Sequence, residues 1–139
     1  MNNCMLCTLD PDSAIWSDNH CAVVLDTGSE FTGWCKVVWK AHVTEYSQLS
    51  EEQACHFMKV VRNVELAIIS VFTPDKVNLT SLGLQVPHLH MHVTPRYIDD
   101  SRYPKSVWEL VVRDVSRPGA TPEDVRKLQF KLDELLNKY

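Results

Sequence analysis

Three histidines alternate with apolar residues in the second half of the chain, at His88, His90 and His92. In an extended strand, residues two apart point to the same face, so this spacing predicts three imidazoles in one row. The apolar residues between them would point the other way, into a core. Consecutive rings would stand about 6.6 Å apart, which lets one imidazole face a phosphorus atom while its neighbours reach the surrounding oxygens. The sequence therefore predicts a reactive row on a rigid strand over 85–96.

Such a row has three chemical interpretations. The imidazole nitrogens can converge on zinc, iron or copper, although such sites usually include a carboxylate or a further histidine. A purely structural row is unfavourable, because burying three titratable rings without partners costs free energy. The third interpretation is nucleophilic catalysis, in which a neutral imidazole attacks an α-phosphate, forms a phosphoramidate and is released by water. A rigid strand supplies the orientation that this displacement requires, and we favour this interpretation.

Two other parts of the sequence carry residue types suited to binding. Cys4 and Cys7 form a CxxC motif, which is either a pair of half-buried thiols or half of a zinc site. Histidines would have to complete such a site, since the chain has no second CxxC. Asp26 begins an Asp-Thr-Gly-Ser segment, where its carboxylate either forms the turn or accepts hydrogen bonds from ribose hydroxyls.

The elements that would position these residues can be read from hydrophobic patterning. Strands are expected as two short segments within 14–25, then over 34–39, 76–82 and 85–96. The capping box at 50–53 predicts the start of a helix, whose apolar stripe of about twenty residues stops before Pro74. Thr121, followed by proline, predicts a second helix over about 121–138 with one apolar face. Trp108, in the polar segment before it, is interpreted as a packing residue.

Composition limits the class of protein. The 139 residues are 45% hydrophobic, which suffices for one core and is too little for two ordinary domains. The formal net charge of −4 and the lack of a basic run argue against nucleic-acid binding, while a local patch still suffices for a small anion. An odd number of cysteines without an apolar leader or a membrane-length run argues against a disulfide framework and a membrane location. We expect a single cytoplasmic domain spanning 1–139.

Residues 88–94 resemble the signature of the histidine triad (HIT) family, in which three histidines alternate with apolar residues. Residues 33–42 are similar to the family's glycine, apolar strand and Lys-x-His segment. Shorter matches are the asparagine strand, the exit from the triad and the CxxC that opens many members, at Asn78, Pro95-Arg96, and Cys4 with Cys7. The resemblance covers roughly residues 4–100 and leaves a C-terminal extension that holds the second helix.

The resemblance implies an α+β fold with a mainly antiparallel sheet, one long helix and a C-terminal helix, usually paired as a homodimer. It implies nucleotidyl hydrolase or transferase activity that needs no cofactor for its chemistry. His90 would be the nucleophile that takes the nucleotidyl group, and His92 would hydrogen-bond the α-phosphate or orient the nucleophile. Four further residues would bind the substrate, namely Asn78 and Gln85 beside the phosphate, Asp26 at the ribose and Val24 near the base.

His42 and His88 each have two roles within the family. In some members the CxxC, the Lys-x-His histidine and the first triad histidine hold a structural zinc ion. All four positions are filled here, by Cys4, Cys7, His42 and His88. Two cysteines and two histidines make a closed tetrahedral set of the kind found in structural sites. In members without zinc, the same two histidines support the nucleophile and count among the catalytic residues.

Several positions depart from the family pattern. Leu84 stands where a glutamine is common, and Gln85 follows one place later. Thr94 replaces the last apolar residue of the signature, and Trp39 stands where a proline is common. These features are most similar to a bacterial branch often labelled diadenosine tetraphosphate hydrolases.

We therefore predict an enzyme that cleaves a nucleoside phosphate derivative, with a dinucleoside polyphosphate as the leading substrate and an adenosine phosphoramidate next. An alternative from another class is a nucleotide-binding or zinc-stabilised interaction module with little turnover. A redox metal centre on the histidine row is a third possibility.

Overall fold

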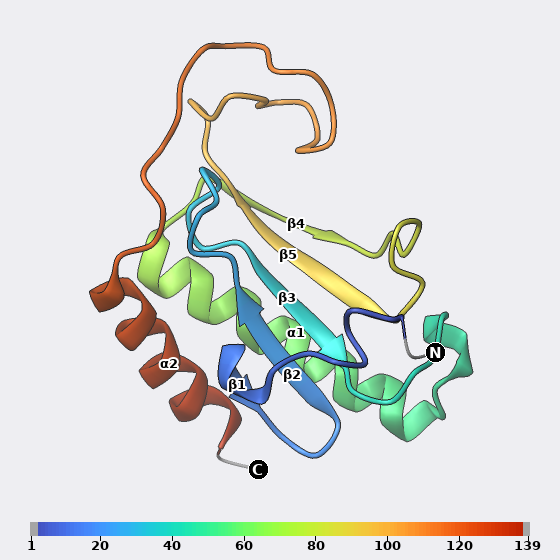
Figure 1. Cartoon of the computed structure of the whole chain (residues 1–139). Coiled ribbons are helices and arrows are strands. Elements are labelled where there is room, and N and C mark those ends of the chain that lie inside the picture. Colours follow the sequence, from blue (N-terminus) through green and yellow to red (C-terminus); the bar gives the residue numbers. More distant parts are fainter. Residues whose placement is uncertain (1–2, 138–139) are drawn as a thin grey trace.

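Five antiparallel strands form one sheet in the order β1-β2-β3-β5-β4 (Figure 1). The structure is a computed structural model that describes residues 3–137. The strands are β1 Ala14–Ser17, β2 Cys21–Leu25, β3 Cys35–Trp39, β4 Lys76–Thr80 and β5 His90–Arg96. The helices are α1 Glu51–Phe72 and α2 Pro122–Leu136, with short 3₁₀ turns at Pro11–Ser13 and Tyr46–Gln48. No helix in the described part of the chain combines the length and apolarity needed to cross a membrane.

The two faces of the sheet differ in chemistry. Residues paired across a ladder share a face, so His90 lies with its partner Val38, and His92 lies with Lys36. The opposite face is apolar, and its central residues Val37 and Val93 are fully buried. Helix α1 packs against that apolar face and supplies the other half of the core (Figure 1). Helix α1 therefore leaves the histidine-bearing face uncovered, so that a ligand can approach it.

Helix α1 begins and ends as the sequence predicts. The Ser50 side chain accepts a hydrogen bond from the Gln53 N–H, and the Gln53 side chain accepts one from the Ser50 N–H. The helix ends at Phe72, and the next residue, Thr73, adopts the left-handed conformation with φ 46° directly before Pro74. The side chains of its core stripe are Phe57, Val60, Val61, Val64, Ala67 and Ile68, all with no exposed surface.

Helix α2 packs on α1 and on the edge strand β1. Thr121 caps its first turn by accepting a hydrogen bond from the Asp124 N–H. Leu128 and Leu132 are fully buried in the shared core. The predicted helix start is confirmed; the helix ends at Leu136, and residue 138 of the predicted range lies outside the described residues.

The histidine strand is shorter than the alternating pattern predicts. Strand β5 begins at His90, not at residue 85, and β4 ends at Thr80, not at residue 82. Pro87 has no N–H to donate to a ladder, and the His88 N–H closes a tight turn onto the Val86 carbonyl. His88 therefore precedes the strand, and the prediction that all three histidines lie within one strand was wrong.

Candidate functional site

His90 is held in a tautomer that leaves one ring nitrogen free. Its Nδ1 lies 2.6 Å from the main-chain oxygen of His88. A carbonyl oxygen only accepts hydrogen bonds, so Nδ1 carries the proton and Nε2 carries the lone pair. The residue is 8% exposed and lines a cavity of about 670 Å³. A neutral imidazole fixed in this way can attack a phosphorus atom that enters the cavity.

We call this space the triad cavity. Its floor is the histidine-bearing face of β3 and β5, where Lys36, His90 and His92 line it. The loop segment 82–86 also lines it, as do Thr80, Ser106 and Trp108. A volume of this order falls within the range of small-molecule sites.

His92 is the second histidine of the cavity, and it is also fixed by a neighbour. The Trp34 indole N–H donates to His92 Nδ1 at 3.2 Å, so the His92 proton resides on Nε2. Burial, together with the nearby His90 and Lys36, lowers the pKa of His92 to about 4. The ring is therefore neutral at neutral pH and can donate an Nε2–H hydrogen bond to a bound oxygen.

Sequence reasoning missed Lys36 and Trp34 as site residues, and it expected Trp108 only to pack. Lys36 is half-buried in the triad cavity, and no hydrogen bond or ion pair joins its ammonium group to any residue between 3 and 137. Trp34 and Trp108 pack edge to face, and the rings of both contact His92 with centroids 5.5 and 5.2 Å away. Trp108 thus packs, as expected, and also lines the cavity with 48% of its surface exposed. A lysine within an apolar strand was the available signal for Lys36.

A second cluster gathers Cys4, Cys7, His42 and His88. One ligand atom from each lies within 4.8 Å of the other three. The two Nδ1 atoms are 3.2 Å apart, and three sulfur-to-nitrogen distances are 3.2, 3.4 and 3.5 Å. A tetrahedral zinc ion separates two bound nitrogens by about 3.3 Å and a nitrogen from a sulfur by about 3.5 Å. The donor set and its spacing therefore fit zinc.

The His88 ring has one nitrogen free to bind a metal ion. Its Nε2 lies 2.6 Å from the Trp39 carbonyl and must carry the proton, which leaves the Nδ1 lone pair for a metal. Burial lowers the pKa of His88 and so favours the neutral ring that a metal needs. Because the adjoining His90 proton is held by the His88 carbonyl, the cluster also stabilises the backbone that orients His90.

The residues expected at the substrate are spread over several places. Gln85 lines the triad cavity. Val24 is half-buried in the same cross-strand row as Lys36 and His92. Asp26 is exposed after β2, where its carboxylate accepts a hydrogen bond from the Gly28 N–H at 3.1 Å. Asn78 instead lines a neighbouring cavity and accepts a hydrogen bond from the Arg96 side chain.

Another group with metal-ligand residue types has a structural explanation. Asp18, Cys21 and His56 lie close together. The Asp18 carboxylate already accepts hydrogen bonds from the His20 and Cys21 N–H groups and pairs with His56 at 2.7 Å. Burial and the nearby Asp18 raise the pKa of Cys21 to about 12, so the thiol stays protonated. This group fixes the turn between β1 and β2.

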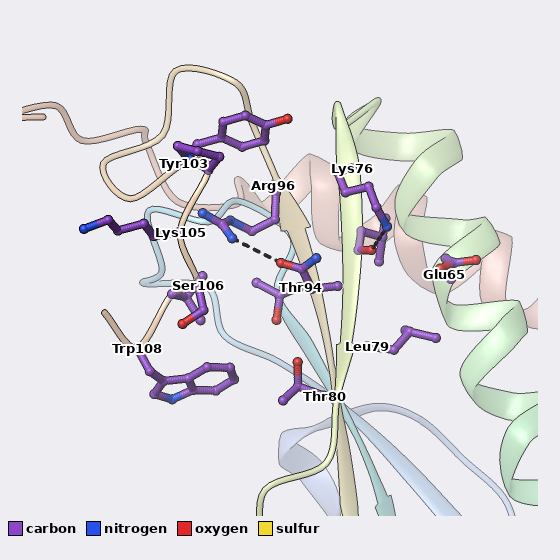
Figure 2. Close-up of a pocket in the computed structure, with 14 residues that line it drawn as sticks. Glu65, Lys76, Leu79, Thr80, Thr94, Arg96, Tyr103, Lys105, Ser106 and Trp108 are labelled. Atoms are coloured by element: carbon purple, nitrogen blue, oxygen red, sulfur yellow. Dashed lines mark hydrogen bonds between the residues drawn. The ribbon is translucent and has the colours of Figure 1, made fainter. Parts of the chain in front are cut away.

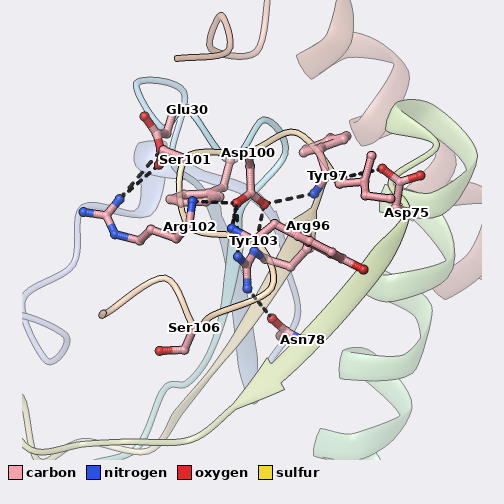
Figure 3. A network of polar contacts seen from close by, with 12 residues as sticks. Glu30, Asp75, Asn78, Arg96, Tyr97, Asp100, Ser101, Arg102, Tyr103 and Ser106 are labelled. Carbon is pink, nitrogen blue, oxygen red and sulfur yellow. Dashed lines mark hydrogen bonds and ion pairs between the residues drawn. The ribbon is translucent and has the colours of Figure 1, made fainter. Parts of the chain in front are cut away.

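A buried ion pair anchors the segment that carries Trp108 (Figure 3). The Arg96 guanidinium donates two hydrogen bonds, of 3.0 and 3.1 Å, to the two oxygens of Asp100. The same carboxylate accepts from the N–H groups of Tyr97, Arg102 and Tyr103. Burial alone would raise the pKa of Asp100, but these hydrogen bonds outweigh it and hold the pKa below its usual range. The network therefore fixes how the chain leaves β5.

Loss of this carboxylate charge should destabilise the protein. We expect Asp100→Asn to lower the free energy of unfolding by about 3 kcal/mol, because it leaves the Arg96 charge buried without its partner. Asp99→Asn is the matched control, since Asp99 is exposed and its pair with Arg117 lies at the surface. The control should cost less than about 1 kcal/mol. Urea denaturation measures both, and equal losses would contradict a dominant role for the buried pair.

Known proteins resemble this chain in sequence and in fold. The HIT domain family model matches residues 8–99. The protein named Protein hit from Bacillus subtilis is 25% identical over 143 residues, covering 96% of this chain and 94% of that protein. A histidine triad protein from Bradyrhizobium japonicum has a similar structure, with a TM-score of 0.72, 22% identity and coverage of 88% of this chain and 89% of that chain. The predicted α+β fold is confirmed by this likeness.

A second solved structure bears on the cysteine and histidine cluster. It is a zinc-bound histidine triad family protein from Mycobacterium smegmatis, with a TM-score of 0.71 and 21% identity. The similarity covers 99% of each chain. A protein with the same fold as this chain has thus been solved with zinc bound.

Proposed function

The chain belongs to the histidine triad (HIT) family, and from that premise we propose that it is a nucleotidyl hydrolase or transferase working through His90. The observation that supports this proposal is the 2.6 Å hydrogen bond from His90 Nδ1 to the His88 carbonyl. It makes Nε2 the lone-pair nitrogen of a ring that lines the triad cavity.

The proposed reaction has two displacements at one phosphorus atom. In the first, His90 Nε2 attacks the α-phosphorus, a P–N bond forms, and the bond to the leaving group breaks with its electron pair. A leaving phosphate departs as an anion and needs no proton from the protein. In the second, water attacks the same phosphorus, the P–N bond breaks with its electron pair returning to Nε2, and the water releases a proton to the solvent. Products are a nucleoside monophosphate and the free leaving group, and Nε2 regains its lone pair.

Two neighbours of His90 suit the charge that develops at phosphorus. The neutral His92 can donate its Nε2–H to a non-bridging oxygen, because Trp34 occupies its other nitrogen. The Lys36 ammonium group lies on the same row and is available to neutralise a phosphate. These two groups would act most strongly on the transition state, where the transferred oxygens carry the most charge.

The finer assignments are proposals that follow the family pattern. A dinucleoside polyphosphate is the leading substrate, and the Lys36 charge in the triad cavity supports an anionic leaving group. Asn78 and Gln85 would lie beside the phosphate, Asp26 at the ribose and Val24 near the base. Zinc at the cysteine and histidine cluster, a homodimer, a cytoplasmic location and a single domain over 1–139 complete the proposal.

A panel of nucleotide substrates labelled at the α-phosphate tests the proposed function. We expect a nucleoside monophosphate product and, after rapid quenching, labelled protein whose label survives alkali and is lost in acid, as a P–N bond requires. Tight nucleotide binding without turnover across the panel would favour the alternative of a binding module. Turnover without any labelled protein would contradict the covalent intermediate.

The low pKa of His92 predicts a pH-dependent stability. Between its ordinary value of 6.5 and the native value of about 4, the unfolded chain binds a proton that the native ring excludes. Stability therefore falls as pH falls through this interval. Lowering the pH from about 7 to about 4.5 should reduce the free energy of unfolding less in a His92→Gln variant than in the wild type. The difference should be about 1 kcal/mol, a figure that is reduced because the ring is partly exposed. Denaturation at both pH values measures this difference. An equal pH dependence in both proteins would contradict it, and His20→Gln is the control because His20 is exposed.

A further inference from the structure

A second cavity of about 730 Å³ adjoins the triad cavity. Figure 2 shows the residues that line this second cavity. We call it the distal cavity. It lies over β4 and the C-terminal half of β5, against the loop segment 103–108. Thr80, Ser106 and Trp108 line both cavities, so the two spaces share a boundary. A ligand whose α-phosphorus is at His90 can therefore extend into the distal cavity.

The distal cavity contains a buried hydroxyl with no partner. Thr94 is 1% exposed, and its Oγ1 makes no hydrogen bond to any residue between 3 and 137. Such groups are uncommon, because a buried polar atom without a partner costs free energy. Thr94 lies on the face that carries His90 and His92, with Asn78 as its ladder partner. Figure 2 shows it at the wall of the cavity near Thr80. A bound hydroxyl or heterocycle nitrogen would satisfy it.

The distal cavity offers hydrogen-bonding groups and aromatic surface, and one of its charges is already paired with a carboxylate. The Arg96 charge is neutralised by Asp100, and the Lys76 ammonium group donates to the Val77 carbonyl at 2.8 Å. Figure 2 shows Lys105 extending away from the cavity. The aromatic surface comes from Tyr103 and Trp108, and the hydroxyl and amide groups come from Thr80, Thr94, Ser106 and Asn78. These are the groups that recognise a nucleoside, whereas the triad cavity with Lys36 suits phosphates.

We propose that the distal cavity binds the nucleoside of the leaving group, with Thr94 Oγ1 as a specificity-determining contact. This inference rests on the proposed function, since it assumes nucleotidyl transfer to His90. Along the strand, Thr94 stands about 13 Å from His90, so a leaving group as small as ammonia does not reach it. A dinucleoside polyphosphate does: attack at one α-phosphorus of a tetraphosphate releases a nucleoside triphosphate whose nucleoside can occupy this cavity.

Two substrates with the same transferred group test the proposal. Diadenosine tetraphosphate and adenosine 5′-phosphoramidate both give adenylyl-His90, and they differ only in the leaving group. In Thr94→Val, the ratio of kcat/KM for the tetraphosphate to kcat/KM for the phosphoramidate should fall about tenfold. Thr94→Ser keeps the hydroxyl and should restore the ratio to within about threefold of the wild type. Inhibition by ATP should weaken more than inhibition by AMP in the valine variant.

The outcomes separate the two proposals. Thr94→Val should fold at least as stably as the wild type, because the hydroxyl it removes has no hydrogen-bond partner within residues 3–137. An unchanged substrate ratio in this variant, with both substrates turned over by the wild type, would overturn the distal subsite alone. A ratio that falls equally in Thr94→Ser would overturn the role of the hydroxyl. Absence of wild-type turnover on both substrates would overturn the proposed function and the subsite with it.

Discussion

Turnover by a His90→Asn variant should fall by about 10³-fold or more, while its affinity for a nucleoside monophosphate stays within a few-fold of the wild type. Asparagine can still donate a hydrogen bond to the His88 carbonyl, so the local backbone should keep its conformation. The variant has no nitrogen lone pair with which to attack phosphorus. The loss should therefore appear in kcat and not in binding.

Steady-state kinetics and calorimetry on the same preparations measure the two quantities. His20→Asn is the matched control, because it makes the same replacement at an exposed ring outside both cavities. The control should turn over substrate at close to the wild-type rate. Turnover by His90→Asn within tenfold of the wild type would contradict a covalent role for His90, as would loss of binding in parallel with turnover.

Paired replacement of Cys4 and Cys7 by serine should release one zinc ion per chain and lower the free energy of unfolding by about 5 kcal/mol. The two thiolates supply half of the tetrahedral set, and the two histidines alone bind zinc weakly. The cluster links residues near the N-terminus to the segment preceding β5, so its loss should lower Tm more than it alters the chemical step. Any change in the rate of the chemical step should come only from a shift of the His88 backbone, because the His88 carbonyl holds the His90 ring.

Elemental analysis and thermal denaturation check this expectation together. Cys55→Ser serves as the control, since Cys55 is an exposed thiol outside the cluster. It should leave both the zinc content and Tm unchanged. An unaltered Tm in the double variant would remove the structural-zinc hypothesis. Iron or copper in the untreated protein would instead support the redox centre that the histidine pattern left open.

Local sequence determined the elements that need only near neighbours. The start of α1 follows from the reciprocal bonds of Ser50 and Gln53, and its end follows from Pro74. The start of α2 follows in the same way from Thr121. In each case the deciding contacts join residues a few positions apart. The pattern also placed His90 and His92 on one face, because alternation in a strand is a local property.

The alternating pattern predicted wrongly that His88 lies in the strand. The sequence contains the reason for this error, but hydrophobic patterning alone does not take it into account. Pro87 cannot donate to a ladder, and so the strand begins only at His90. The ring of His88 then turns to His42 and the two cysteines. The family resemblance named these four residues as a set, although the distance along the chain from Cys4 to His88 gives no local signal for their meeting.

The sequence by itself thus determined the helices, the face of the central imidazole and the identity of the candidate nucleophile. Only the tertiary structure decided the proton positions on that face, since Trp34 reaches His92 across 58 positions of the chain. It also decided that Lys36 and Trp108 line the triad cavity, and that the Thr94 hydroxyl is buried without a hydrogen-bond partner in the described part of the chain. The reason is physical: caps and periodicity depend on bonds within one turn or strand, whereas these contacts depend on strand register and on how a long loop folds back over the sheet.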